Sequence, residues 1–311
     1  MVTEMSLSNG IGVAVIGAGL MGHGIAQVFA RAGHRVAITD PDQAVREASL
    51  EHIRRNLREE DIDPAPTLDH IRLAGSLDEA VGDADLVFEA VPEKLALKQQ
   101  LFGAVARLAP RHSVLASNTS VIPITRIGEH LDADARSRLL GTHWWNPPHL
   151  IPLVEVVRTP YTDNGVFERT FAWLRQVGKK PVRVQQDVTG FIGNRLQHAL
   201  WREAISLIEA GVCDAEAIDT VVKNSFGMRL PVLGPIENAD LVGLELTRDV
   251  HRVMFPELNC GKTSAKILDR LIDAGHTGMR AGQGLRTWTR EEAEAVRRRL
   301  ATHLIDMTRR G

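Results

Sequence analysis

A glycine-rich turn constrains this chain of 311 residues more than any other feature. Residues 17–24 read G-A-G-L-M-G-H-G, and the apolar run of residues 12–16 precedes them. After the turn, apolar residues recur at helical spacing over residues 25–30. A buried strand, a glycine turn and an amphipathic helix in this order form the dinucleotide-binding fingerprint. We therefore predict that the chain begins with a β-α-β unit that binds a dinucleotide.

Each glycine of the turn has its own expected task. Gly17 permits the tight turn, Gly19 lets the backbone approach a pyrophosphate, and Gly22 lets the helix pack closely on the strand. The helix N-terminus then offers free N–H groups and a positive dipole end to the phosphates. The expected cofactor-binding residues of the turn are Gly17, Gly19, Leu20, Met21 and Gly22.

An acidic residue indicates which dinucleotide is bound. A second strand is expected over residues 35–39, and Asp40 follows it directly, 18 residues after Gly22. A carboxylate at this distance binds the hydroxyls of the adenosine ribose. Because it also repels a 2′-phosphate, the sequence favours NAD over NADP.

Composition narrows the class of protein. The chain is 44% hydrophobic and 24% charged, as in a soluble globular protein, and its net charge of −2 favours neither nucleic acid nor a membrane. Cys213 and Cys260 lie far apart without the spacing of a metal site, as expected of reduced thiols. Residues 1–10 lack a secretory pattern, and no apolar run is long enough to cross a bilayer. We expect a cytoplasmic protein without a bound metal.

Strand and helix patterns divide the chain into two domains. Up to about residue 186 they alternate, which predicts a Rossmann-type, doubly wound parallel sheet. From residue 190 the strand patterns disappear and helical segments follow, including one expected over residues 237–254. We predict an α/β domain over residues 1–186 and an all-α domain over residues 187–311. The many apolar faces of the second domain favour a homodimer.

One histidine is placed to act as a catalytic base. His143 ends a predicted strand, at the sheet edge where open α/β sheets bind ligands, and its neutral imidazole accepts a proton near pH 7. Glu155 stands alone inside an apolar strand, where an unpaired acid is costly to bury. Pairing with His143 would satisfy it, but the spacing alone leaves a structural histidine and an edge-strand glutamate equally open.

Two further groups of polar residues are candidates for the same site. Residues 117–120, S-N-T-S, come just after a strand and face the same crevice, although such a cluster also occurs in ordinary turns and helix caps. Asn194 lies near the start of the long helix, where a polar surface role is the alternative.

Taken together, the motifs resemble those of the L-3-hydroxyacyl-CoA dehydrogenase family. They occur in the family's order and span about residues 11–288: G-A-G-L-M-G (17–22), V-P-E-K-L-A-L-K (91–98), S-N-T-S (117–120), H-W-W-N-P (143–147) and G-F-I-G-N-R (190–195). The resemblance implies an NAD-dependent dehydrogenase that oxidises a 3-hydroxyacyl-CoA or a related 3-hydroxy acid to the 3-keto product.

The resemblance also implies residue roles. His143 would be the base and Glu155 its partner, while Ser120 and Asn194 would contact the reacting oxygen. Ser120, Glu93 and Lys98 match cofactor-contacting positions, the last two beside the nicotinamide ribose, and Asn146 lines the nicotinamide and substrate site.

Two segments depart from the usual family pattern. Acyl-CoA members carry a longer, lysine-bearing hairpin between the second and third strands, whereas residues 61–66, D-I-D-P-A-P, are acidic and broken by prolines. The usual H-F-F-N-P is H-W-W-N-P here. These departures are similar to outlying members that act without CoA on carnitine, gulonate or a pyridine-carboxylate aldehyde. Trp144 and Trp145 either fill the core or form a wall for a flat substrate, and we expect His149 at the surface.

A non-catalytic alternative is a crystallin-like or NAD-sensing protein that kept the fold. The complete set of His143, Glu155, Ser120 and Asn194 argues against it, because a sensor needs none of them.

Overall fold

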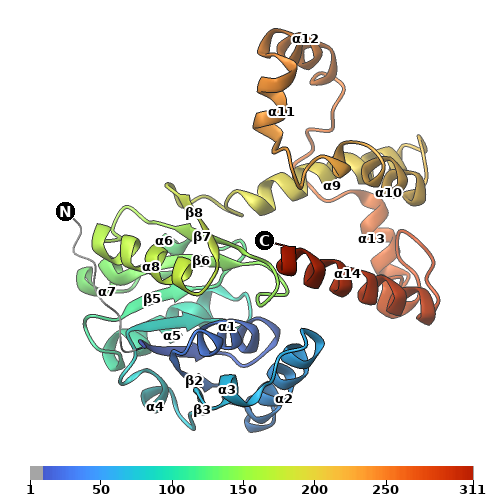
Figure 1. Ribbon diagram of the computed structural model, residues 1–311. Coiled ribbons are helices and arrows are strands. Elements are labelled where there is room, and N and C mark those ends of the chain that lie inside the picture. Colours follow the sequence, from blue (N-terminus) through green and yellow to red (C-terminus); the bar gives the residue numbers. More distant parts are fainter. Residues whose placement is uncertain (1–9, 311) are drawn as a thin grey trace. The chain divides into compact units, whose positions relative to one another are not determined.

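A computed structural model describes residues 10–310 of the chain (Figure 1). These residues form two compact units. The first comprises residues up to Asn194 together with those from Leu304 onward, and the second comprises Arg195–His303. The first unit is an α/β structure and the second is helical.

The α/β unit is organised by one eight-stranded sheet. Its strand order is β3-β2-β1-β4-β5-β6-β7-β8. This order reverses direction between β1 and β4, which creates the crevice where doubly wound sheets bind ligands. The strands are β1 (Gly12–Ile16), β2 (Arg35–Thr39), β3 (Ile71–Leu73), β4 (Leu86–Glu89), β5 (Val114–Ser117), β6 (Leu139–Trp144), β7 (Leu153–Val157) and β8 (Lys180–Val184).

Helices cover both faces of the sheet, as the alternation of strands and helices predicts. One hydrophobic cluster joins the sheet to α1, α2 and α8, and a second joins the opposite face to α4, α5, α6 and α7. Neighbouring strand residues, such as Val13 and Ala14, therefore belong to different clusters. The helices are α1 (Leu20–Arg31), α2 (Gln43–Glu59), α3 (Ala65–Leu68), α4 (Leu77–Val81), α5 (Leu95–Leu108), α6 (Ile124–Ile127), α7 (Ala133–Arg138) and α8 (Asn164–Gln176).

One strand pair departs from the predicted parallel sheet. β6 and β7 are antiparallel, whereas every other neighbouring pair is parallel. The connection over residues 145–152 is too short for the crossover that a parallel pair requires, which takes about a dozen residues or more. The predicted Rossmann-type, doubly wound sheet is confirmed, and its one antiparallel pair determines the geometry of the site described below.

The second unit is helical, with one difference from the sequence prediction. The helix expected over residues 237–254 is two helices, because Gly243 adopts a positive φ of 101° and ends the first of them. The helices are α9 (Gly193–Glu209), α10 (Ala215–Lys223), α11 (Pro235–Val242), α12 (Leu244–Met254), α13 (Lys266–Asp273) and α14 (Arg290–Arg310), with short 3-10 turns at Phe226–Met228 and Met279–Ala281. Gly193–Asn194 at the start of α9 and the end of α14 belong to the first unit.

The glycines of the fingerprint turn have different physical reasons to be glycine. Gly17 has a φ of 97°, which a side chain rarely adopts. A Cβ on Gly22 would overlap the carbonyl oxygen of Gly17, whereas a Cβ on Gly19 would have no heavy atom within 4 Å. Gly22 is therefore required by the fold, and Gly19 keeps a space open beside the start of α1.

Two alanine substitutions test this distinction. We expect Gly22→Ala to lower the free energy of unfolding by about 1–3 kcal/mol, because its methyl group must displace backbone. Gly19→Ala should change it by less than about 0.5 kcal/mol, because Gly19 has a φ of −66° and open space around it. Urea unfolding of both variants measures the difference, and equal losses would contradict the assignment.

Candidate active site

The antiparallel pair places His143 directly opposite Glu155. The two residues are register partners on β6 and β7, so their side chains lie on the same face of the sheet. Nδ1 of His143 lies 2.7 Å from Oε2 of Glu155, and the two side chains are 5% and 2% exposed. Because β6 runs parallel to β5, His143 lies near the sheet edge that also holds the end of β5.

The second oxygen of Glu155 is held by a tight backbone turn. Its Oε1 accepts hydrogen bonds from the backbone N–H groups of Ile192 and Gly193, at 2.8 and 3.0 Å. Gly190 and Phe191 adopt positive φ values of 75° and 49°, which turn the chain so that both amides point at the carboxylate. A non-glycine residue in this region costs about 1–3 kcal/mol, and the two charge-assisted hydrogen bonds offset that cost.

These contacts determine the charge of Glu155. Burial acts to raise its pKa, but the hydrogen bonds from His143, Gly193 and Ile192 outweigh burial, so that the pKa lies below its usual value. An ionised carboxylate only accepts hydrogen bonds. Nδ1 of His143 must therefore carry the proton of the shared bond, which leaves Nε2 of the neutral ring without a proton and able to accept one.

Aromatic rings lie beside the imidazole of His143. The ring centroids of Trp145 and Phe191 lie 5.3 and 5.7 Å from that of His143, both tilted. Trp144 belongs to the opposite face of the sheet, where it packs edge-on against Phe88 in the core. Trp144 is therefore a core residue, and Trp145 is a residue of the site.

Ser120 and Asn194 lie together in the first unit. The side-chain amide of Asn194 donates to the backbone oxygen of Ser120 at 2.9 Å, and Ser120 is exposed. The neighbouring Asn118 accepts a hydrogen bond from the backbone N–H of Trp144, which ties this loop to the end of β6.

Glu93 and Lys98 form part of a buried ionic network. Nζ of Lys98, 1% exposed, lies 2.6 Å from Glu89 and 3.2 Å from Glu93. Burial raises the pKa of Glu89, against the opposing effect of the Lys98 ammonium. Oε1 of Glu93 accepts hydrogen bonds from the hydroxyl of Thr119 and from the backbone N–H groups of Ser120 and Val121. The network therefore holds the loop that carries Ser120.

The fingerprint turn offers a cradle that fits a dinucleotide phosphate. α1 has Gly19 as its N-cap and no side-chain cap, so its first N–H groups are available to an anion. The open space at Gly19 lies at this terminus, and Leu20 is 59% exposed beside it. Asp40 lies under the turn and accepts hydrogen bonds from the backbone N–H groups of Ala18 and Asp42. The residues present therefore fit NAD.

Two residues after β6 complete the predicted set. Asn146 is exposed, as a residue that contacts ligand must be. His149 is partly buried rather than at the surface, so this expectation is wrong. Its Nδ1 is shielded from solvent without a hydrogen-bond partner in the described structure, and burial lowers its pKa to about 4.

Glu89 and Phe191 belong to the site but were not predicted from the sequence. Glu89 is an acid at the end of the apolar strand 86–89, the same signal that identified Glu155. Phe191 gave no such signal, because its importance comes from a left-handed backbone conformation.

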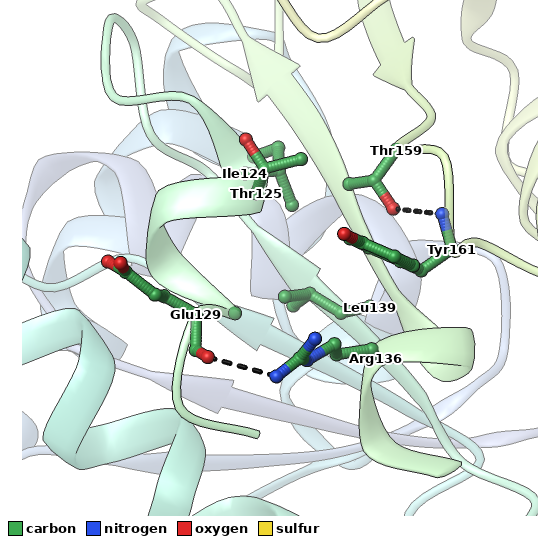
Figure 2. A pocket seen from close by; sticks show the side chains of 8 residues that line it. Ile124, Thr125, Glu129, Arg136, Leu139, Thr159 and Tyr161 are labelled. Carbon is green, nitrogen blue, oxygen red and sulfur yellow. Dashed lines mark hydrogen bonds between the residues drawn. The ribbon is translucent and has the colours of Figure 1, made fainter. Parts of the chain in front are cut away.

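A separate small pocket contains none of these residues (Figure 2). Its Arg136 lies over the ring of Tyr161 and donates hydrogen bonds to the backbone oxygens of Glu129 and Leu131. Within residues 10–310 no group of three or more His, Cys, Asp or Glu is arranged to hold a metal ion.

Comparison with known proteins identifies the family of the chain. Residues 12–188 match the family described as 3-hydroxyacyl-CoA dehydrogenase, NAD binding domain, and residues 190–288 match its C-terminal domain. A 5-formyl-3-hydroxy-2-methylpyridine 4-carboxylate 5-dehydrogenase of Mesorhizobium japonicum is 33% identical, over 96% of this chain and 97% of its own. A probable 3-hydroxybutyryl-CoA dehydrogenase of Bacillus subtilis is 34% identical, over 88% of this chain and 95% of its own.

A solved structure of a similar protein has the same fold. The crystal structure of a 5-formyl-3-hydroxy-2-methylpyridine 4-carboxylic acid 5-dehydrogenase, described as an NAD+-dependent dismutase, has a TM-score of 0.87. It is 33% identical and covers 96% of this chain and 97% of its own. Because both family domains match in order, over residues 12–188 and 190–288, the chain belongs to the 3-hydroxyacyl-CoA dehydrogenase family, an NAD-binding family of oxidoreductases.

Proposed function

We propose that the protein is an NAD-dependent dehydrogenase that oxidises a secondary alcohol, with His143 as the base that removes the hydroxyl proton. The proposal depends on the buried hydrogen bond of 2.7 Å between Nδ1 of His143 and Glu155, which leaves Nε2 of the neutral imidazole without a proton. A 3-hydroxyacyl-CoA or a related 3-hydroxy acid is the first candidate substrate.

In this proposal the protein moves one proton and holds one oxygen. Nε2 of His143 removes the hydroxyl proton, and the carboxylate of Glu155 stabilises the imidazolium that forms. The hydroxyl of Ser120 and the side-chain amide of Asn194 hold the oxygen as it becomes a carbonyl. Bound NAD would supply the acceptor for the hydride that leaves the carbon bearing the hydroxyl group.

We assign NAD binding to an N-terminal domain over residues 1–186. Substrate binding and dimerisation are assigned to a helical domain over residues 187–311. The turn from Gly17 to Gly22, Leu20 and Met21 included, would bind the pyrophosphate, and Asp40 would bind the adenosine ribose. Glu93 and Ser120 would contact the nicotinamide half, with Lys98 beneath them and Asn146 beside the ring. The open space at Gly19 supports this assignment.

Replacement of the base tests the proposal. We expect His143→Ala to lower kcat by at least about 10²–10⁴-fold, because proton transfer to a positioned side chain is lost. NADH binding, followed by its fluorescence, should remain within about twofold of the wild-type value. His130→Ala, a change at an exposed histidine, is the control and should retain activity. Turnover near the wild-type rate in His143→Ala would refute the mechanism.

The acidic tip at residues 61–63 favours a second candidate, a small substrate without CoA such as carnitine, gulonate or a pyridine-carboxylate alcohol or aldehyde. The tip of the segment between α2 and α3 is acidic, and the guanidinium of Arg309 lies 2.6 Å from Asp61 on it. This contact comes from the end of α14, beyond residue 288 where the family match ends. The Asp61 side chain is still 82% exposed, and its carboxylate and that of the exposed Asp63 repel the phosphates of CoA. The Mesorhizobium relative, named for a pyridine carboxylate, supports the same candidate.

A substrate panel separates the two candidates. NADH formation is measured with 3-hydroxybutyryl-CoA, free 3-hydroxybutyrate, L-carnitine, L-gulonate and a pyridine-carboxylate aldehyde. The acidic tip predicts higher kcat/KM with a free acid or aldehyde than with the thioester. Activity with the thioester alone would establish the first candidate, and tight NADH binding without any turnover would favour a non-catalytic protein.

We further propose a homodimer in the cytoplasm. Across residues 195–303, all of them described, Ala293 is the only buried apolar residue. The exposed side chains include Val232 (84%), Ile236 (74%), Leu241 (73%) and Val253 (71%). A helical unit of this size needs a partner to bury such a surface, and a second copy of the chain supplies one.

The unpaired Cys213 and Cys260 support a reducing compartment. Among the described residues, no helix has the length and apolar character needed to cross a bilayer.

Light scattering during size-exclusion chromatography tests the dimer. The wild-type protein should elute with twice the mass of the chain, and Leu241→Glu should elute as a monomer with reduced helical circular dichroism. Leu108→Glu, at an exposed apolar residue of the α/β unit, is the matched control and should stay dimeric. A wild-type monomer with full helicity would contradict the proposal.

A further inference from the structure

Trp145, the first residue after β6, lies against His143 and against the glycine whose backbone N–H binds Glu155. Its ring centroid lies 5.3 Å from that of His143. Its outer ring atoms lie against Gly193, whose backbone N–H donates a hydrogen bond to Glu155. We propose that Trp145 is a positioning residue for His143, and that Gly193 is glycine because the indole of Trp145 needs its space. The proposal rests on the function proposed above, because it concerns the same base.

A single hydrogen bond does not fix the direction of an imidazole. The bond from Nδ1 to Glu155 still allows the ring to tilt about that contact, and tilting would move Nε2 away from the reacting hydroxyl. Trp145 and Phe191 limit this motion, because the ring of each contacts the imidazole. Phe191 is fully buried and held by its own turn, whereas Trp145 begins a connecting segment and depends on its contacts for its position.

The backbone at position 193 does not itself require glycine. Gly190, three residues earlier, has a positive φ, but Gly193 is not among the glycines with that conformation. A Cβ at position 193 would lie inside the contact distance of Cζ2 of Trp145 and 3.3 Å from both Cε2 and Cη2. The three heavy atoms nearest to such a Cβ therefore all belong to the indole.

Hydrogen bonding does not explain the indole. Nε1 of Trp145 is shielded from solvent and has no acceptor among the described residues, and the same is true of Nε1 of Trp144. A buried donor without a partner is unfavourable, so hydrogen bonding gives no reason for tryptophan at either position. For Trp145 the size of the ring gives one, because its Cζ2, Cε2 and Cη2 atoms extend from beside His143 to Gly193.

Four variants test the pair: Trp145→Phe, Gly193→Ala, the double variant, and Trp144→Phe as the matched control. We expect Gly193→Ala to lower kcat by about 100-fold, the effect of a small misplacement of a catalytic group. Trp145→Phe should lower kcat by about 10-fold, and the KM for NAD should stay within about twofold in both. The double variant should recover at least about tenfold over Gly193→Ala, because phenylalanine lacks the outer ring atoms that the new methyl group meets. Trp144→Phe should lower the unfolding midpoint and keep kcat within about threefold of the wild-type value.

Three results would overturn the proposal: wild-type kcat in Trp145→Phe, wild-type kcat in Gly193→Ala, or a double variant no better than Gly193→Ala. A second readout does not depend on turnover. In protein labelled with ¹⁵N-histidine, the ring signals of His143 are identified by their absence in His143→Ala. They should shift in Gly193→Ala and return toward the wild-type position in the double variant. If the wild-type protein turns over no substrate, the proposed function fails, and these signals alone decide whether Trp145 positions His143.

Discussion

The single antiparallel strand pair, β6 with β7, is the constraint on which the site depends. Because β6 and β7 are joined by only residues 145–152, they must run in opposite directions, and this register puts His143 opposite Glu155. Burying either residue alone would be costly, since an unpaired carboxylate in the core is strongly unfavourable. Together they form one buried hydrogen bond. The turn at Gly190 and Phe191 then positions two backbone N–H groups that donate hydrogen bonds to the other oxygen of Glu155.

The same sheet edge gathers the other parts of the site. β1 ends at the glycine turn, β4 ends at Glu89, and β5 ends at the loop that carries Ser120. The buried network around Lys98 joins the last two, because Glu89 and Glu93 share its ammonium and Glu93 holds the backbone of Ser120. Cofactor cradle, base and oxygen-binding groups therefore depend on strands that are neighbours in the sheet but distant in the sequence.

Local patterns predicted much of this structure. The fingerprint turn, the strand that ends near His143 and the isolated acid at Glu155 were readable, because glycine, apolar runs and buried charges leave strong signals. Strand direction at β7 was not readable, because an apolar strand looks the same in either direction. The break at Gly243, the left-handed Phe191 and the burial of His149 were also missed, because each depends on contacts that form only in the folded chain.

The protonation of His143 is the most direct test of this account. The ¹⁵N chemical shifts of its ring nitrogens, measured in the neutral form of the free protein, report which nitrogen carries the proton. We expect a protonated Nδ1 bonded to Glu155 and an unprotonated Nε2, with this preference lost in Glu155→Ala. A protonated Nε2 in the wild-type protein would contradict it, because His143 would then have no free nitrogen to accept the hydroxyl proton.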